Sequence, residues 1–205
     1  MNLEEQFTDL ISRYHKTGTH TQPLWKELVG AYSESNRKYH SLAHLEDMYA
    51  QLQPLQSQFG NWDAVLFALF YHDAVYNTLR SNNEEKSAEL AGERMETIGI
   101  HPEVKARVLR HILATKSHVK SADNDTNLFT DADLSILGAD EQRYKQYAQQ
   151  IRQEYWVYPD VVYKPGRKKV LRHFLDMDVI YKTQHFAGLY EKQARINLQT
   201  ELDTL

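Results

Sequence analysis

The stretch Trp62–Tyr76, WDAVLFALFYHDAVY, decides the fold class. Its apolar run from Ala64 to Tyr71 is continuous, and Asn61 before it is a residue type that caps helix N-termini. A helix that is apolar on every side must be surrounded by protein. The sequence therefore predicts a central buried helix with other helices packed around it.

The flanking segments also show helical spacing. Apolar residues recur with this period, as in Leu3, Phe7 and Leu10, whereas the alternation typical of strands is hard to find. We therefore predict an all-α fold. The other expected helices include segments at about 22–35, from about 41, from Ser87 to a C-cap at Gly99, from Pro102, and at about 140–157, 166–181 and 186–202, with Pro159 and Pro165 in the gap after 157.

Composition limits the classes of function. The chain has 205 residues, of which 41% are hydrophobic and 25% charged, as in ordinary globular proteins. Its net charge of -4 offers no broad cationic field, so bulk nucleic-acid binding is not expected. No apolar run reaches the roughly 18 residues of a membrane span, and the acidic, amphipathic start is unlike a signal peptide. We expect no membrane association and a cytoplasmic location.

The absence of cysteine restricts any metal site to other ligands. Without thiolates or disulfides, the strong ligand types that remain are histidine, aspartate and glutamate. His72 and Asp73 follow the apolar run inside the same expected helix, where both side chains carry a high desolvation cost unless they have partners. Two satisfied polar groups that hydrogen-bond to neighbouring helices would also explain the pair.

Two further groups lie on either side of this pair. His40 and His44 are four residues apart, which places them on one helix face if the segment is already helical at His40. Asp131 and Asp133 precede a short apolar helix. Taken singly, the histidines can be surface residues, and one aspartate can be an N-cap with the other solvated.

Taken together, these groups resemble the HD superfamily of metal-dependent phosphohydrolases, whose pattern is a histidine, an adjacent His-Asp pair and a distant aspartate on separate helices. The resemblance covers about residues 40–138. It implies an HD-type helical bundle with His44, His72, Asp73 and Asp133 as metal ligands. We expect one domain over residues 1–205, with a metal-site core at about 36–140 and a C-terminal helical extension at about 141–205.

The resemblance also implies the chemistry. Histidine and aspartate ligands suit a divalent ion such as Mn, Mg, Fe, Co, Ni or Zn and leave positions for water and phosphate. The metal-activated water would attack phosphorus. In the cyclic-nucleotide phosphodiesterase branch, the earlier histidine of a Tyr-His-Asn-x-x-x-His stretch is a proton donor. Tyr39-His40-Ser41 departs by the serine, and His40 is the corresponding candidate for a general acid.

Weaker candidates lie elsewhere in the chain. Glu84 can orient a catalytic water, or it can be one of the acidic residues that favour a first helical turn. His111 and His118 lie where some two-metal members carry additional ligands, and His118 can contact a second metal or a substrate phosphate. Arg167, in a basic cluster around Pro165, can bind an anionic group, or it can belong to a solvated helix start.

The sequence thus predicts a metal-dependent phosphohydrolase that acts on a small phosphomonoester or phosphodiester, with nucleotides among the possible substrates. The alternative from another class is an HD-fold regulatory module that binds metal or nucleotide without efficient turnover. Oxygen activation at paired irons is a third hypothesis, which requires more ligands than the pattern supplies. Neither the substrate nor the oligomeric state follows from the sequence.

Overall fold

The computed structural model describes residues 2–14 and 20–205, and the part of the chain that it describes is all-helical, with ten α-helices, two short 3-10 helices and no strand. The predicted all-α fold is confirmed. None of the described helices is both long enough and apolar enough to cross a membrane. The chain forms two compact units, Met1–Thr130 and Asp131–Leu205.

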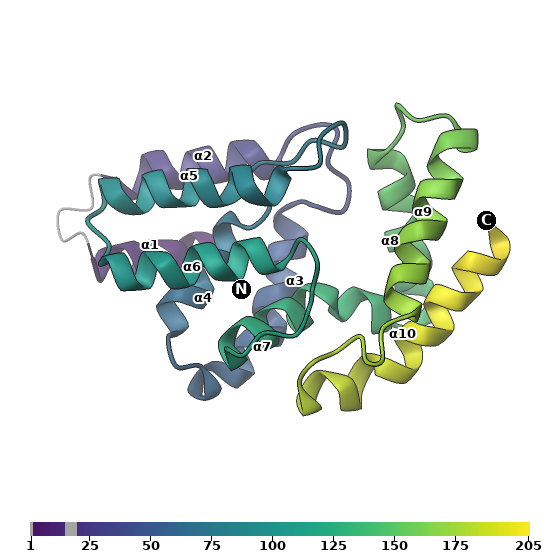
Figure 1. The fold of residues 1–205 in the computed structure, drawn as a ribbon. Coiled ribbons are helices and arrows are strands. Elements are labelled where there is room, and N and C mark those ends of the chain that lie inside the picture. Colours follow the sequence, from purple (N-terminus) through teal and green to yellow (C-terminus); the bar gives the residue numbers. More distant parts are fainter. Residues whose placement is uncertain (1, 15–19) are drawn as a thin grey trace. The chain divides into compact units, whose positions relative to one another are not determined.

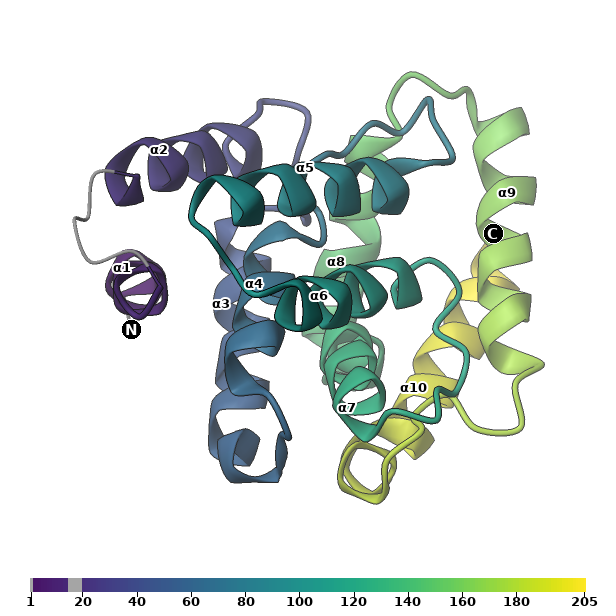
Figure 2. The ribbon, with the colours of Figure 1, turned by 60° about the vertical axis from the view of Figure 1, so that its left-hand side comes forward.

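The first unit surrounds α4 with the other helices of its half of the chain. Helix α6 lies against both α4 and α5, and α1 and α3 also contact α4 (Figures 1 and 2). The elements are α1 (Leu3–Ser12), α2 (Thr21–Tyr32), α3 (Leu42–Leu52), η1 (Gln53–Gln58), α4 (Trp62–Tyr71), α5 (Asn83–Thr97), α6 (Pro102–Ala114) and the first part of α7 (Asn124–Asp133).

Helix α4 is the buried centre of this unit. Every residue from Ala64 to Tyr71 is buried, as the apolar run predicts. The N-cap is also confirmed, because Ala64 N donates to Asn61 Oδ1 at 2.9 Å. Asp125, at the start of α7, accepts from the backbone N–H groups of Gly60 and Asn61 and so holds the loop that leads into α4.

Helix α4 ends earlier than expected. We expected His72 and Asp73 inside the helix, but the helix stops at Tyr71 and both residues lie in the turn that follows. The N–H of Asp73 donates to the hydroxyl of Tyr32 at 3.2 Å, and this bond takes the place of the next bond of the helical ladder. The pair therefore lies at the buried C-terminal end of α4.

The boundary between α5 and α6 follows the local sequence signals. Gly99 has φ +73°, which a glycine adopts without strain, and its N–H donates to Glu96 O. The N–H of Ile100 reaches back to Met95 O. Pro102 then begins α6, as predicted, whereas the C-cap of α5 is Ile98 and the predicted Gly99 is the residue that follows it.

Several predicted boundaries were wrong. Helix α5 begins at Asn83, before the expected Ser87. Helix α2 ends at Tyr32, although apolar spacing had suggested about Ser35. Helix α9 runs from Asp160 to Leu175 and not over about 166–181, so Pro165 lies inside it and does not precede it. Proline has no backbone N–H, so Pro165 removes one hydrogen bond of the helical ladder. The remaining hydrogen bonds of α9 continue to Leu175.

The second unit consists of η2 (Leu134–Gly138), α8 (Glu141–Glu154), α9 (Asp160–Leu175) and α10 (Gln184–Thr204). Helix α10 packs against both η2 and α9. Its start is held by Asp131, whose carboxylate accepts from the N–H groups of Lys182 and Thr183 at 2.9 and 2.8 Å and pairs with Lys182 Nζ at 2.8 Å. This unit therefore begins at Asp131, within α7.

Buried polar bonds also attach α10 to η2. Asn197 donates to the carbonyl groups of Leu137 and Ala139, at 2.9 and 2.8 Å. Gly138 lies between these two residues, and a Cβ atom placed on it would come within 2.5 Å of Tyr190 Cβ and 2.8 Å of Tyr190 Cα. A glycine is required here because the backbones of η2 and α10 approach too closely for any side chain.

The close approach predicts opposite effects for two Gly→Ala variants. Gly138→Ala should lower the free energy of unfolding by about 1–3 kcal/mol or more, since overpacking must displace α10 backbone. Gly188→Ala, also in α10 but with no atom within 4 Å of the added Cβ, should raise it by about 0.5–1 kcal/mol through helix propensity. Urea denaturation measures both, and a neutral Gly138→Ala would contradict the packing described.

Candidate metal centre

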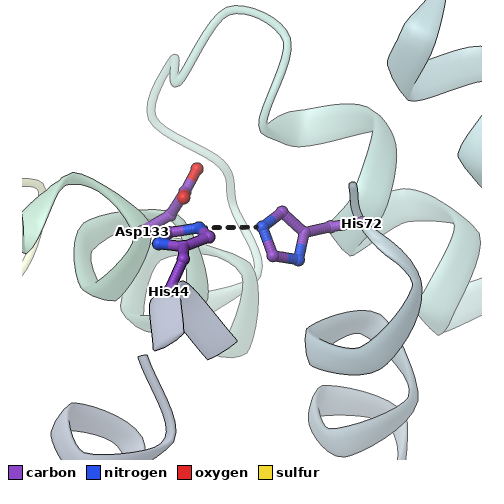
Figure 3. Close-up of side chains that lie close together, drawn as sticks. All are labelled: His44, His72 and Asp133. Carbon is purple, nitrogen blue, oxygen red and sulfur yellow. Dashed lines mark hydrogen bonds between the residues drawn. The ribbon is translucent and has the colours of Figure 1, made fainter. Parts of the chain in front are cut away.

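Three separate helices carry the candidate ligands. His44 lies in the first turn of α3, His72 directly follows α4, and Asp133 is in the last turn of α7. One nitrogen of each histidine and one carboxylate oxygen of Asp133 all lie within 4.8 Å of one another. Figure 3 shows the two imidazole rings with their nitrogens facing and the Asp133 carboxylate beside them. The described residues therefore contain a group that can hold a metal ion.

Asp133 is the last residue of the continuous helix α7. The division between the two units falls within α7, between Thr130 and Asp131. Residues 124–130 of the same continuous helix belong to the first unit, where Asp125 holds the loop before α4 and Phe129 packs its ring against His72, with centroids 5.9 Å apart. The helix itself thus brings Asp133 close to the histidines.

The hydrogen bonds of His72 assign its tautomer. Its Nδ1 lies 3.0 Å from the carbonyl oxygen of Leu69, and because a carbonyl can only accept, Nδ1 carries the proton. The neutral ring then has a lone pair on Nε2, which faces His44 Nε2 at 3.2 Å. A backbone carbonyl that orients a histidine in this way is the usual outer partner of a metal-binding imidazole.

Asp73 brings a carboxylate to the same nitrogens. Its Oδ2 lies 3.2 Å from His72 Nε2 and 4.0 Å from His44 Nε2. Burial raises the pKa of Asp73, but the positive charge that His72, His40 and His44 carry in their protonated forms, and the hydrogen bond that a protonated His72 ring donates, lower it by more, so the net pKa lies below the usual aspartate range. The carboxyl group is ionised at neutral pH.

This donor set fits a cation. The lone pair on His72 Nε2 faces the Asp73 carboxylate, and two acceptors at this separation repel each other unless a proton or a cation lies between them. Two imidazole nitrogens and two carboxylates are also the ligands that divalent transition metals bind. The four residues of the predicted ligand set thus lie together, with Asp133 in the group of three and Asp73 in contact with both histidines.

His40 lies beside this group but not on its helix. Helix α3 begins at Leu42, with Ser41 as N-cap, so His40 precedes it and the expected helical i, i+4 relation to His44 is not present. The two rings are nevertheless close, with centroids 6.0 Å apart. The ring of His40 stacks on Tyr76 at a centroid distance of 4.3 Å and an interplanar angle of 29°.

The weaker candidates lie outside this cluster. Glu84 is in the first turn of α5, where its charge helps to raise the pKa of Lys116, whose main partner is Glu85. His118 follows α6 with φ +53°, and its N–H donates to Ala114 O. Neither residue belongs to the ligand group found among the described residues.

Arg167 belongs to an internal ion pair of the second unit. Its side chain is buried and donates through Nε and Nη2 to the carboxylate of Glu201, at 2.7 and 2.9 Å. The guanidinium also lies over the ring of Tyr147. The ion pair with Glu201 and the contact with Tyr147 give the Arg167 guanidinium partners within the second unit. The expected contact of Arg167 with substrate stays a prediction.

Sequence reasoning did not identify Arg37 or Tyr32. Both contact the turn that contains Asp73: Arg37 Nη1 donates to Asp73 O at 2.5 Å, and the Tyr32 hydroxyl accepts from Asp73 N. A lone arginine in the polar stretch 33–41 has no spacing that marks it. In the sequence, only its position three residues before His40 connects Arg37 with the candidate site residues.

Comparison of the chain with protein-family models, curated proteins and solved structures found no match.

His111 is buried in the first unit and is not a member of the ligand group. Its Nδ1 lies 2.8 Å from Thr126 Oγ1, and its ring packs against Phe129. Burial lowers its pKa from 6.5 to about 4, with Asp123 and Asp125 acting in the opposite direction. The folded protein therefore holds this ring neutral in a range where the unfolded chain protonates it.

This difference predicts a loss of stability in acid. Well above pH 6.5 the ring is neutral in both states, and as the pH falls through 6.5 toward 4 the unfolded state binds a proton that the folded state does not. Between pH 7.5 and pH 5 this residue should lower the free energy of unfolding by about 2 kcal/mol. Urea denaturation of wild type and His111→Gln at both pH values measures the effect, and an equal pH dependence in both proteins would refute it.

Proposed function

We propose that the chain is a metal-dependent phosphohydrolase, which acts on a small phosphomonoester or phosphodiester, with nucleotides included in that class. The observation that carries the proposal is the convergence of His44, His72 and Asp133 on one point, with Asp73 in contact with both histidines. The resemblance of these residues to the HD pattern supports the same reaction class.

The four residues have distinct parts in holding the cation. His44 and His72 supply neutral nitrogens, and Leu69 O fixes the ring of His72 so that Nε2 points into the group. Asp73 and Asp133 supply negative charge, which favours a divalent ion such as Mn, Mg, Fe, Co, Ni or Zn. When bound, such an ion acidifies water and neutralises charge on phosphoryl oxygens.

His40 is placed to move a proton. The face of its ring rests on Tyr76, which fixes the plane of the imidazole beside the ligand group. A histidine has an ordinary pKa near ~6.5, so it can donate a proton to the departing oxygen of a phosphate ester at neutral pH. Asp73 remains ionised and balances the positive charge of His40 in its protonated form.

The first test measures metal and turnover together. Purified wild type should contain or bind close to one divalent ion per chain and release phosphate from a panel of nucleotides and sugar phosphates in Mn²⁺. His72→Ala should lose both, while His101→Asn, an exposed N-cap of α6, should keep both. Elemental analysis and phosphate release are the measurements.

The outcomes separate the hypotheses. Metal in wild type with a bound but uncleaved nucleotide in excess Mn²⁺ would favour a regulatory module over an enzyme. Equal, negligible metal in wild type and His72→Ala would reduce the cluster to buried polar residues and end the phosphohydrolase proposal.

A second test concerns His40. His40→Gln should keep the metal but lower kcat by roughly 10²–10⁴-fold on an alkyl phosphate ester, whose leaving oxygen needs a proton. The loss should be much smaller on p-nitrophenyl phosphate, because its leaving group departs as a stable anion. Steady-state kinetics on the two esters measure the contrast, and equal losses on both would remove the general-acid role.

A further inference from the structure

Arg37 joins the two segments that carry the candidate ligands of the first unit. It lies in the stretch between α2 and α3, and its side chain is only 1% exposed. Nη1 donates to the carbonyl oxygen of Asp73 at 2.5 Å, and Nη2 donates to that of Ala74 at 3.1 Å. One guanidinium thus binds two consecutive carbonyl groups of the turn after α4.

These carbonyl groups need such a donor because of how α4 ends. The last carbonyl groups of a helix and the turn after it have no partner within the helix, and burial removes water as an alternative. A guanidinium is planar and presents its N–H groups as a rigid fork, so it can hold two neighbouring acceptors in a fixed relation. The ammonium of a lysine cannot reproduce this geometry.

The same side chain also reaches the segment before α3. Nη1 lies 3.5 Å from the carbonyl oxygen of His40, and Nε donates to Glu34 at 3.1 Å. From His40 the chain passes through Ser41, whose carbonyl accepts the N–H of His44 in the first turn of α3. Arg37 therefore contacts both the segment that leads into the helix of His44 and the turn that contains His72 and Asp73.

Two tyrosines hold the guanidinium in place. Its carbon lies 5.2 Å from the ring centroid of Tyr32 and 5.3 Å from that of Tyr76. Cation–π contacts of this kind are stronger when the cation is buried. Tyr32 also accepts the N–H of Asp73, and Tyr76 stacks on His40, so the rings that hold Arg37 also contact the candidate site.

We propose that Arg37 is a positioning residue for the metal centre: its bonds to the Asp73, Ala74 and His40 carbonyl groups set the separation of the His44 and His72 nitrogens. Arg37 does not touch the metal or the substrate. The effect of Arg37 on metal affinity rests on the proposed metal-binding function. The relative position of the His44 and His72 rings does not, and it can be measured without metal.

The test compares Arg37→Lys with Arg94→Lys. Arg94 makes a similar two-nitrogen contact, but its acceptor is the side chain of Glu27 and not the backbone of the turn after α4. Isothermal titration with Mn²⁺ gives the Kd, and two-dimensional ¹H–¹⁵N NMR of the histidine rings in the metal-stripped protein reports the environment of His44 and His72. Thermal melts establish that each variant is folded at the assay temperature.

Arg37→Lys should raise the Kd for Mn²⁺ on the order of 10–100-fold, as removal of outer partners of metal ligands does elsewhere. The His44 and His72 ring signals should move or broaden, and Arg94→Lys should change neither. Tyr32→Phe, which keeps the ring but removes the acceptor of Asp73 N–H, should act in the same direction to a smaller extent, and it replaces Arg37→Lys if that variant does not fold.

Unchanged ring signals and Kd in the folded variant would overturn the role of Arg37 while leaving the metal centre intact. If wild type itself fails to bind Mn²⁺, the proposed function fails. The NMR signals of the His44 and His72 rings then decide by themselves whether Arg37 positions these two side chains.

Discussion

The arrangement of the first unit depends on one constraint: α4 is apolar and buried from Ala64 to Tyr71, so its C-terminal end lies inside the protein. The polar groups that follow it, the His72 ring, the Asp73 carboxylate and two backbone carbonyl groups, must find partners without water. Arg37 and Tyr32 satisfy the backbone, Leu69 O takes one side of the His72 ring, and the remaining nitrogen and carboxylate face the ligand group.

In this arrangement, the residues that satisfy the backbone of the turn after α4 differ from the residues that form the candidate metal site. The backbone of the turn is held by groups that do not take part in the proposed chemistry. The side chains of His72 and Asp73 are therefore directed toward His44, and the lone pair of His72 Nε2 lies 3.2 Å from Asp73 Oδ2. Two acceptors this close repel each other electrostatically, and a cation bound between them would replace this repulsion by two attractive contacts.

The parts that the sequence predicted well have local causes. The continuous apolar run identified α4, Gly99 and Pro102 marked a helix end and a helix start, and the composition excluded thiolate ligands. The grouping of His44 and His72 with Asp133 was expected from their order along the chain and from the resemblance to a known pattern. In each case the signal lies in a few neighbouring residues or in a specific spacing.

The parts that the sequence missed are long-range. Arg37 is one charged residue in a polar stretch, and its importance arises from contacts to residues about 36 positions away. Asp131 was expected to cap its own short helix or to be solvated, yet it holds the start of α10. The start of α9 was misplaced because a proline inside a helix carries the same local signal as a proline that precedes one.

Crystals of the protein grown with Mn²⁺ would test the central claim most directly, through anomalous diffraction measured above and below the manganese absorption edge. The account predicts one strong anomalous peak within bonding distance of His44 Nε2, His72 Nε2 and the Asp133 carboxylate, with Asp73 adjacent. An anomalous map with no peak at this position, at a manganese concentration well above micromolar, would contradict it.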